Sequence, residues 1–306
     1  MNTAVTPQAL SASARARAQK LKVTLDSTLT SYWYYPALNS KPLGSIVFIH
    51  GYRGNHHGLE AIAGAISNFD VYIPDLPGFG ASEPFSEQHT IDRYAHWVRD
   101  FLESLKLNSK PHLLGHSFGS IVVSAYAAQF KGISSLILEN PVAAPALTGP
   151  KAATTKLAKA FFWLAGALPD ALGTGLLKSW PMVRGMSIIM TKTRQRDLRS
   201  WVHQQHDENF NDFANRRVAL EAYQASISNC VGDFAANFTA PTLMMIGDLD
   251  DITTVAQQQV LFENLPVKQK HLKQHGAVGH LTHYEVPAAI ANDIEQWASE
   301  VGESRK

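Results

Sequence analysis

Residues 112–130 read HLLGHSFGSIVVSAYAAQF, and this stretch decides the fold. The apolar run HLLG leads into the motif GHSFG at residues 115–119, and a helical pattern rich in small residues begins at Phe118. A strand, a sharp turn and a helix in this order are the context in which a G-x-S-x-G motif exposes its serine hydroxyl on a strained turn. Both glycines are needed because a Cβ at either position would clash where the strand meets the helix. The stretch therefore predicts that Ser117 is a nucleophile rather than a structural loop serine.

The sequence on either side of this stretch alternates between short β-rich runs and longer helical patterns. Strand patterns span residues 22–29, 30–35, 45–50, 71–74, 111–114, 135–139, 242–246 and 267–272. Helical patterns span residues 57–67, 91–107, 118–130 and 254–264, and one more begins at Pro287. Such alternation implies right-handed crossover connections between parallel strands. We therefore predict an α/β fold with a mostly parallel, doubly wound sheet.

A long segment interrupts this alternation after the sixth strand pattern. Residues 141–240 contain no convincing strand pattern and carry helical stretches rich in Ala, Leu, Met and Trp. We predict a helical cap at 141–240, inserted into a core formed by residues 21–140 and 241–306. An insertion at the carboxyl edge of such a sheet covers the crevice where ligands bind. Its apolar side chains either pack within the cap or line an acyl pocket; they are Phe161, Phe162, Trp163, Leu164, Trp180, Met182, Met186 and Trp201.

Composition excludes several classes of protein. The chain has 306 residues, enough for a large core, and its 27 Lys and Arg balance 26 Asp and Glu. This near-zero net charge argues against a nucleic-acid-binding protein, which needs a basic excess to contact phosphates. The single cysteine, Cys230, excludes an intramolecular disulfide and a cysteine-built zinc site. No uncharged apolar run reaches the ~18 residues of a membrane span. We therefore predict a soluble, cytoplasmic protein without stable membrane insertion.

Residues 1–20 are predicted to form a basic tail ahead of the first strand. The stretch up to residue 22 contains Arg15, Arg17, Lys20 and Lys22 and no acidic residue. An organelle transit peptide has this composition, but a frayed or helical tail is the simpler interpretation. A secretory signal is not expected, because the stretch has no apolar h-region.

A serine hydroxyl needs a neighbouring base, and the base needs an acid that orients it. His280 is the preferred base, because it follows a strand pattern, lies in the loop GAVGH at residues 276–280 and precedes the final helix. His283, three residues further on, is the competing candidate. His116 flanks the nucleophile, and we expect it to pack behind Ser117.

The orienting acid is expected at the end of another strand. Residues 247–251 read GDLDD and follow the strand pattern TLMMI, so Asp248, Asp250 and Asp251 are all candidates. Glu139, at the end of the strand pattern 135–139, is an alternative acid. Acidic side chains in solvated loops are common, so these residues alone leave the choice open.

The order nucleophile, acid, base along the chain is that of one superfamily in particular. From Lys22 to Trp297 the sequence resembles the α/β-hydrolase superfamily, specifically its cap-bearing branch. The resemblance is carried by five motifs: HGYRG at 50–54, DLPGFGAS at 75–82, GHSFG at 115–119, the G-x-x-D loop at 247–250, and a G-H-x-x-x-x-E-x-P ending at 279–287. Together these motifs are specific for the fold and the triad, and much less so for the substrate.

The resemblance implies a role for each matching residue. It selects Asp250 as the acid and so implies the triad Ser117, Asp250 and His280. It also implies an oxyanion hole formed by the backbone N–H groups of Tyr52 and Phe118.

Two other parts of the motifs are expected to be structural. Pro287 suits the first position of the last helix, and Glu285 lies near the positive end of that helix dipole. The polar residues beside the oxyanion loop are expected to form a solvated loop, with substrate contact as the alternative; they are Arg53, Asn55, His56 and His57.

The predicted function is that of a serine hydrolase with neither a cofactor nor a metal ion. Its substrate is expected to be a small-molecule carboxylic ester with a hydrophobic, short-to-medium acyl part, cleaved through an acyl-enzyme. Ser117 argues against dehalogenase or epoxide hydrolase activity, because those relatives use an aspartate nucleophile. The first alternative is a hydrolase of C–C bonds in vinylogous diketones, in which Arg184 or Arg194 binds a substrate carboxylate. The second is a ligand receptor that keeps the triad and signals through movement of the cap.

Overall fold

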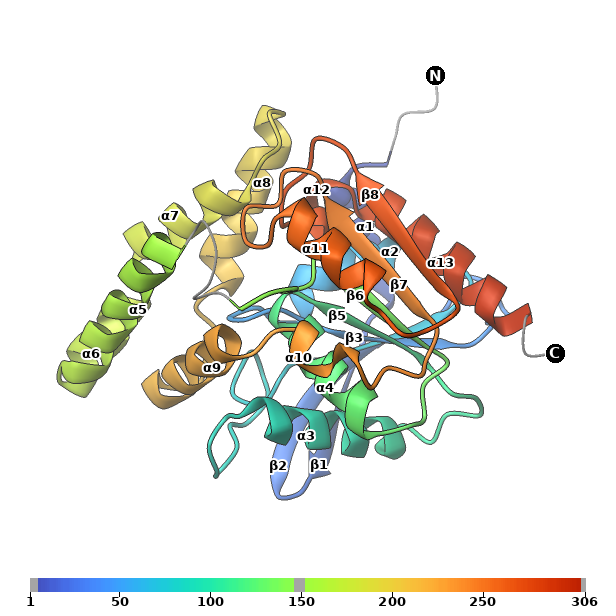
Figure 1. Cartoon of the computed structure of the whole chain (residues 1–306), viewed down its shortest axis with the longest axis horizontal. Coiled ribbons are helices and arrows are strands. Elements are labelled where there is room, and N and C mark those ends of the chain that lie inside the picture. The colour runs from blue at the N-terminus through green and yellow to red at the C-terminus, as the bar shows by residue number, and fades with distance from the viewer. Residues whose placement is uncertain (1–4, 146–151, 304–306) are drawn as a thin grey trace.

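The strands form one mixed sheet in the computed structural model of the chain, which describes residues 5–145 and 152–303. Within these residues the sheet has eight strands in the order β1-β2-β4-β3-β5-β6-β7-β8 (Figure 1). Strand β2 pairs antiparallel with β1 and β4, and the other pairs are parallel. The strands are β1 (Gln19–Leu25), β2 (Thr28–Tyr35), β3 (Ser45–Ile49), β4 (Asp70–Pro74), β5 (His112–His116), β6 (Ser135–Glu139), β7 (Thr242–Gly247) and β8 (Lys270–His275). The predicted α/β fold with a mostly parallel sheet is confirmed.

Helices cover both faces of this sheet, and the central strands are buried on both sides. Ile46 and Phe48 of β3 face one hydrophobic core, whereas Val47 and Ile49 face the other. A strand in this position needs an apolar side chain at every residue, which explains the continuous apolar run SIVFI. The first core also contains residues of α1 (Pro7–Arg17), α2 (Glu60–Ala65) and α13 (Pro287–Glu303), and the second contains residues of α3 (Ile91–Ser104), α4 (Phe118–Gln129) and α11 (Val255–Glu263).

The N-terminal residues that the sequence predicts as a tail include helix α1. Thr6 caps this helix by accepting a hydrogen bond from the backbone N–H of Ala9 at 3.3 Å. Leu10 and Ala14 are buried. A Cβ at Gly64 would lie 1.9 Å from the carbonyl oxygen of Leu10, so the backbones of α1 and α2 are in direct contact. Helix α1 is therefore packed onto the core.

Two strand boundaries differ from the prediction. The predicted strand 22–29 is broken by a turn, because Asp26 and Ser27 have φ of 43° and 66° and reverse the chain between β1 and β2. Strand β8 begins at Lys270 and not at Val267. As an edge strand it reads KHLKQH, with charged and polar side chains that protect an exposed edge and weaken the apolar pattern.

The segment between β6 and β7 is helical in its described part. Figure 1 shows helices α5 to α9 of this segment beside the sheet, with α5, α6 and α7 on the opposite side of the picture from α13. Its helices are α5 (Ala152–Ala167), α6 (Asp170–Leu177), α7 (Trp180–Met190), α8 (Arg196–Asn209), α9 (Arg216–Ser228) and α10 (Gly232–Ala235). An isolated bridge between Phe79 and Phe213 joins the segment to the loop after β4. Among the described helices of the whole chain, none is both long enough and apolar enough to cross a membrane.

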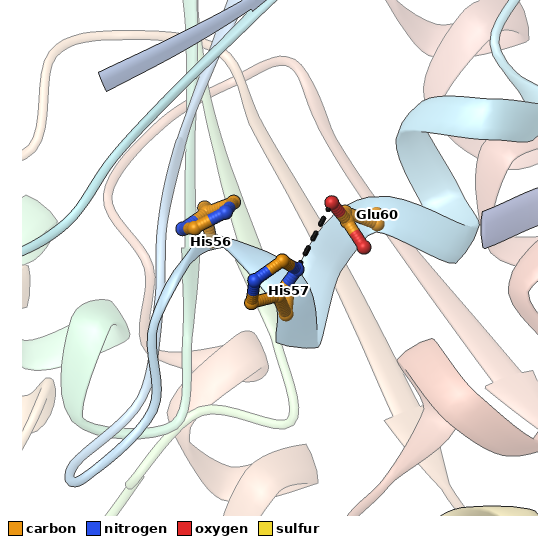
Figure 2. A group of neighbouring side chains, drawn as sticks. All are labelled: His56, His57 and Glu60. Atoms are coloured by element: carbon orange, nitrogen blue, oxygen red, sulfur yellow. Dashed lines mark ion pairs between the residues drawn. The ribbon is translucent and has the colours of Figure 1, made fainter. Parts of the chain in front are cut away.

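The polar stretch after β3 is largely buried. Figure 2 shows His56 and His57 on the short 3-10 helix His56–Leu59, beside Glu60 at the start of α2. Arg53, Asn55 and His56 are buried, and only the His57 side chain is partly exposed. The expectation of a solvated loop is therefore wrong for most of this stretch. Its polar groups bind other parts of the protein, as the hydrogen bond between His56 Nδ1 and Asp75 Oδ1 at 2.9 Å illustrates.

Candidate active site

Ser117 lies at the sharp turn between β5 and α4. Its backbone has φ 52° and ψ −118°, a conformation that L-residues rarely adopt and that stores strain at functional turns. A Cβ at Gly115 would lie 2.4 Å from the carbonyl oxygen of Gly119, and a Cβ at Gly119 would lie 2.2 Å from that of Ile49. The two glycines of the motif are thus required by the close packing of β3, β5 and α4. The turn projects the serine side chain from the carboxyl end of the sheet.

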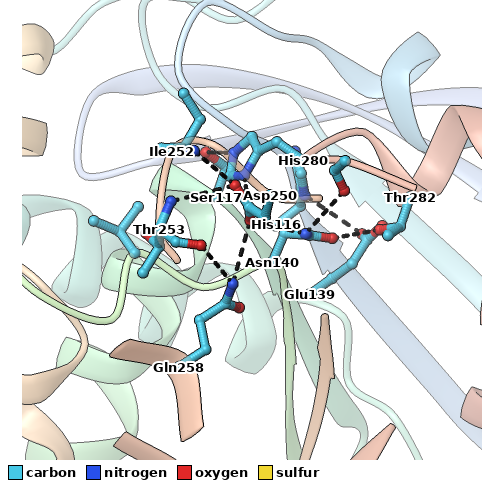
Figure 3. Close-up of polar contacts among 12 residues, drawn as sticks. His116, Ser117, Glu139, Asn140, Asp250, Ile252, Thr253, Gln258, His280 and Thr282 are labelled. Atoms are coloured by element: carbon cyan, nitrogen blue, oxygen red, sulfur yellow. Dashed lines mark hydrogen bonds and ion pairs between the residues drawn. The ribbon is translucent and has the colours of Figure 1, made fainter. Parts of the chain in front are cut away.

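His280 lies between Ser117 and Asp250, as Figure 3 shows. Its Nε2 is 2.8 Å from Ser117 Oγ, and its Nδ1 is 2.9 Å from Asp250 Oδ2. Because the carboxylate is an acceptor, Nδ1 donates to it, and Nε2 is left to accept the serine proton. The structure therefore brings together the three residues that the sequence selects, in the geometry of a nucleophile, a base and an orienting acid.

The Asp250 carboxylate is buried and accepts hydrogen bonds on both oxygens. Oδ1 accepts from the backbone N–H groups of Ile252 at 2.8 Å and Thr253 at 3.2 Å. Oδ2 accepts from His280 and from Asn140 Nδ2 at 3.0 Å. Burial by itself would raise the pKa of Asp250. The charge of His280 and the hydrogen bonds from His280 and Asn140 outweigh burial and hold that pKa below its ordinary value. Asp250 is thus kept as a carboxylate.

Sequence reasoning missed two residues that support the acid. Asn140 follows β6 with φ 43°; its amide also donates to Gly279 O at 3.3 Å, and its oxygen accepts from Thr282 Oγ1 at 2.6 Å. Gln258 on α11 lies 3.4 Å from Asp250 Oδ2. A polar residue directly after a buried strand was a usable signal for Asn140, whereas nothing local in the sequence points to Gln258.

The rival acids occupy other positions. Asp248 accepts from the backbone N–H of Val278 at 3.2 Å and so holds the loop that carries the histidine. Asp251 pairs with Lys192 of the segment between α7 and α8. Glu139 is buried beside His116 and His283, with no hydrogen bond to His280 among the described contacts.

The loop after β3 lies against the nucleophile. A Cβ at Gly51 would be 3.3 Å from Ser117 Cβ, so the next residue, Tyr52, begins beside the serine. Phe118 is the first residue of α4, where the backbone N–H has no partner within the helix. The Tyr52 hydroxyl donates to Ala219 O of α9 at 2.7 Å, which joins this loop to the helical segment above it.

Glu285 contacts both the histidine loop and the segment between α7 and α8. Its carboxylate accepts from the backbone N–H groups of Lys192 at 2.6 Å, Thr193 at 3.0 Å and Gly279 at 3.3 Å. A Cβ at Gly279 would lie 2.9 Å from Met190 O, so the same segment also packs on the glycine before His280. The sequence predicts that Glu285 interacts with the dipole of the last helix. In the structure its carboxylate instead accepts from three backbone N–H groups of two loops.

The apolar residues predicted to line an acyl pocket divide into two groups. Phe162 stacks on Tyr223 with ring centroids 3.6 Å apart and lies 6.3 Å from the Tyr52 ring, next to the loop after β3. Phe161 is partly buried against the core, Met182 contacts Arg53 and Trp201 packs on Tyr284. The other group is exposed to solvent, at 71% for Trp163 and 61% for Trp180, and includes Leu164 and Met186. The side chains of this second group therefore lie on the surface of the helical segment.

A family comparison accounts for most of the chain. The family model described as serine aminopeptidase, S33, matches residues 40–287. The chain belongs to this family. It is therefore a hydrolase of the α/β-hydrolase superfamily, as its motifs predict.

Curated relatives and solved structures agree with this assignment. Lipase 3 of Moraxella sp. is 26% identical over 262 residues, which are 82% of this chain and 76% of the relative. The monoacylglycerol lipase of Mycolicibacterium smegmatis is 27% identical over 271 residues, covering 85% and 89%. An esterase from Exiguobacterium antarcticum superposes with a TM-score of 0.74 at 18% identity, covering 92% of this chain and all of that one. An enol-lactonase from Burkholderia xenovorans superposes with a TM-score of 0.73 at 18% identity, covering 91% of this chain and 100% of that one. These structural likenesses show the fold.

Proposed function

We propose that the protein is a serine hydrolase that cleaves small-molecule carboxylic esters. The observation that carries the proposal is the chain of contacts Ser117 Oγ to His280 Nε2 at 2.8 Å and His280 Nδ1 to Asp250 Oδ2 at 2.9 Å. The lipases among its curated relatives favour an ester over other acyl derivatives. A cytoplasmic location stays a prediction from the sequence.

In the first half-reaction Ser117 Oγ attacks the ester carbonyl carbon while its proton passes to His280 Nε2. Asp250 stabilises the imidazolium that forms. The backbone N–H groups of Tyr52 and Phe118 are the proposed donors to the negative charge that develops on the former carbonyl oxygen. When the C–O bond breaks, His280 returns the proton to the leaving alcohol, and the acyl group stays on Ser117.

In the second half-reaction water replaces the alcohol. His280 takes a proton from the water, whose oxygen attacks the acyl carbon of the Ser117 ester. The intermediate collapses, the carboxylic acid leaves, and the proton on His280 returns to Ser117 Oγ. Each step uses only side chains and amides of this chain.

The apolar part of the substrate is proposed to be a short-to-medium acyl chain. Phe162 and Tyr223 stack beside the Tyr52 loop and offer apolar surface there. Each buried CH₂ contributes about 0.8 kcal/mol, so kcat/KM is expected to rise up to about fourfold per methylene until the chain outgrows the site.

The arginines of the C–C hydrolase alternative give it no support. Arg184 pairs with Asp207 and lies over the Trp180 ring, and Arg194 is exposed. No contact of the described residues favours the receptor alternative either. The ester proposal is therefore the one that the geometry favours.

A p-nitrophenyl ester series from C2 to C16 tests the proposal, with Ser117→Ala as the control. We expect a maximum at short-to-medium chains and loss of activity in the variant. A vinylogous diketone and amino-acid p-nitroanilides serve as competing substrates for C–C and peptide-bond cleavage. A flat, barely detectable ester profile with turnover of either competitor would overturn the ester assignment.

A further inference from the structure

The three residues that compete with the triad in the sequence form a cluster of their own. His116 ends β5, Glu139 ends β6, and His283 lies on the short helix α12 (Thr282–Glu285). His116 Nδ1 is 3.6 Å from Glu139 Oε2, and His283 Nδ1 is 3.6 Å from Glu139 Oε1. The His116 and His283 rings have centroids 4.1 Å apart. All three side chains are buried, and that of Glu139 is fully buried.

Each member of this cluster has a buried polar atom without a hydrogen-bond partner. These atoms are His116 Nδ1, Glu139 Oε2 and His283 Nδ1. Buried polar atoms are nearly always paired, because an unpaired one loses its hydration without compensation. The three side chains offer ligand atoms that lie within 4.8 Å of one another, so one bound ion would satisfy them together.

We propose that His116, Glu139 and His283 bind one transition-metal ion, with Zn²⁺ as the physiological class of ligand. Two imidazole nitrogens and one carboxylate oxygen form a common zinc ligand set, which leaves a fourth position open. The candidate ligand atoms all lie within 4.8 Å of one another. Bonds of ~2.0–2.2 Å around a tetrahedral ion place ligand atoms roughly 3.3–3.6 Å apart, close to the 3.6 Å between His116 Nδ1 and Glu139 Oε2.

A second group of potential ligands, His56, His57 and Glu60, is less suited to a cation (Figure 2). Glu60 Oε2 is already paired with the guanidinium of Arg15 at 2.6 Å. Glu60 Oε1 lies 3.1 Å from His57 Nδ1. An ion at this point would be repelled by Arg15, whereas the cluster at Glu139 has no cationic side chain among its described contacts. The second group therefore serves as the internal control.

An ion at the Glu139 cluster would join helix α12 to the ends of β5 and β6. His283 follows His280 by three residues, so this link fastens the loop that carries the catalytic base to the strand that carries the nucleophile. Because the unfolded chain lacks the assembled ligands, binding stabilises the folded state.

The test uses the Ser117→Ala chain, so that its result does not depend on the proposed ester hydrolysis. The chain is freed of metal with a chelator and titrated with Co²⁺, whose visible absorption reports tetrahedral coordination, and Zn²⁺ is then added in competition. We expect one equivalent of Co²⁺ with a tetrahedral spectrum, displacement by Zn²⁺, and a higher melting temperature in the presence of either ion.

Three further variants in the same background locate the ion. We expect His283→Gln and Glu139→Gln to weaken binding at least tenfold, and His57→Gln to leave it unchanged. Circular dichroism of each metal-free variant checks that it is folded. If Glu139→Gln is not folded, the loss of metal binding is judged from His283→Gln alone. Absence of stoichiometric binding to the folded Ser117→Ala chain, or loss of binding in His57→Gln alone, would overturn the proposal.

Discussion

Two buried carboxylates, Asp250 and Glu139, lie at the carboxyl ends of the neighbouring strands β7 and β6, yet their surroundings differ. Asp250 accepts from two backbone N–H groups, from Asn140 and from His280. Glu139 Oε1 lies 2.5 Å from Thr282 Oγ1, and the carboxylate faces two histidine nitrogens at 3.6 Å, beyond hydrogen-bond distance. Both side chains are shielded from solvent. Burial therefore does not distinguish Asp250, the proposed catalytic acid, from Glu139.

The difference lies in what the backbone around each carboxylate supplies. Asp250 is in a loop whose next residues turn back, so the N–H groups of Ile252 and Thr253 point at its own side chain. Glu139 is the last residue of a strand. The N–H of its neighbour Asn140 donates to Met245 O of β7 at 2.8 Å, so it is not available to the Glu139 side chain. With Gln258 included, five donors surround the Asp250 carboxylate and keep it ionised and stationary, as an orienting acid must be.

The largest expected effect concerns Ser117, which is the proposed nucleophile whether Asp250 or Glu139 is the acid. Ser117→Ala is expected to abolish labelling by a fluorophosphonate and to lower kcat by at least ~10⁴-fold, because the acyl-enzyme can no longer form. Labelling is measured by mass spectrometry of the intact chain. Ser120→Ala, one helical turn further on, is the matched control. Normal labelling of a folded Ser117→Ala chain would contradict the assignment.

The second prediction compares the two acids directly. Asp250→Asn is expected to lower kcat by about 10⁴-fold, because the imidazole loses the partner that fixes its tautomer. Glu139→Gln is expected to change kcat by no more than about tenfold, since Glu139 has no described contact with the base. Kinetics on one ester and an unfolding curve for each variant check this. The reverse ranking would identify Glu139, at the end of β6, as the acid in place of Asp250.

A smaller effect is expected from the residue that bridges the two carboxylates. Asn140→Ala removes one donor from Asp250, and a hydrogen bond to a charged group is worth roughly 1.5–3 kcal/mol, so kcat is expected to fall about 10- to 100-fold with little change in KM. Gln258→Ala, whose contact is longer at 3.4 Å, is the milder comparison. An unchanged kcat in Asn140→Ala would mean that the backbone donors alone hold Asp250.

The smallest expected effect is on the pH dependence of stability. The pKa of Asp250 is lowered in the folded state, so ionised Asp250 stabilises the protein above its ordinary pKa of about 3.8. This contribution is lost as the pH falls through the lower, folded-state value. Below pH 3.8 the wild type should therefore lose unfolding free energy relative to Asp250→Asn, by up to about 1.4 kcal/mol per pH unit. Urea unfolding at pH 7, 5 and 3 measures it; a constant difference would contradict it.

The sheet and the sharp turn at Ser117 could be predicted from the sequence because both depend on local patterns. The choice of Asp250 over the other acids rests on the resemblance to the α/β-hydrolase superfamily, because the residues alone leave that choice open. Continuous apolar runs indicate strands that are buried on both faces of the sheet. A Cβ at Gly115 or Gly119 would clash, so the motif indicates one particular turn between a strand and a helix. The turn at Asp26 and Ser27 is missed because neither residue is the glycine that usually marks such a reversal. The start of β8 is missed because an edge strand carries charged side chains where a buried strand carries apolar ones.

Contacts between distant segments are harder to read from the sequence. Arg53 is expected in solvent because a polar run resembles a surface loop, yet its partners lie more than a hundred residues away. Likewise the role of Asn140 depends on Asp250, which follows it by 110 residues. Such partners are set by the tertiary fold, and a single sequence shows only that the residue is polar.

Arg53 places a buried positive charge next to the active site, and no carboxylate among its described contacts balances it. Its guanidinium donates to Leu177 O at 2.9 Å and Phe210 O at 3.0 Å, and burial lowers its pKa to about 10. These two carbonyl groups belong to the carboxyl ends of α6 and α8, where the helix dipoles are negative. The helices above the sheet are therefore held to the core partly by their own dipoles. Because Arg53 directly follows Tyr52, a shift of either helix end is transmitted along one peptide unit to the Tyr52 amide, which we propose binds the oxyanion.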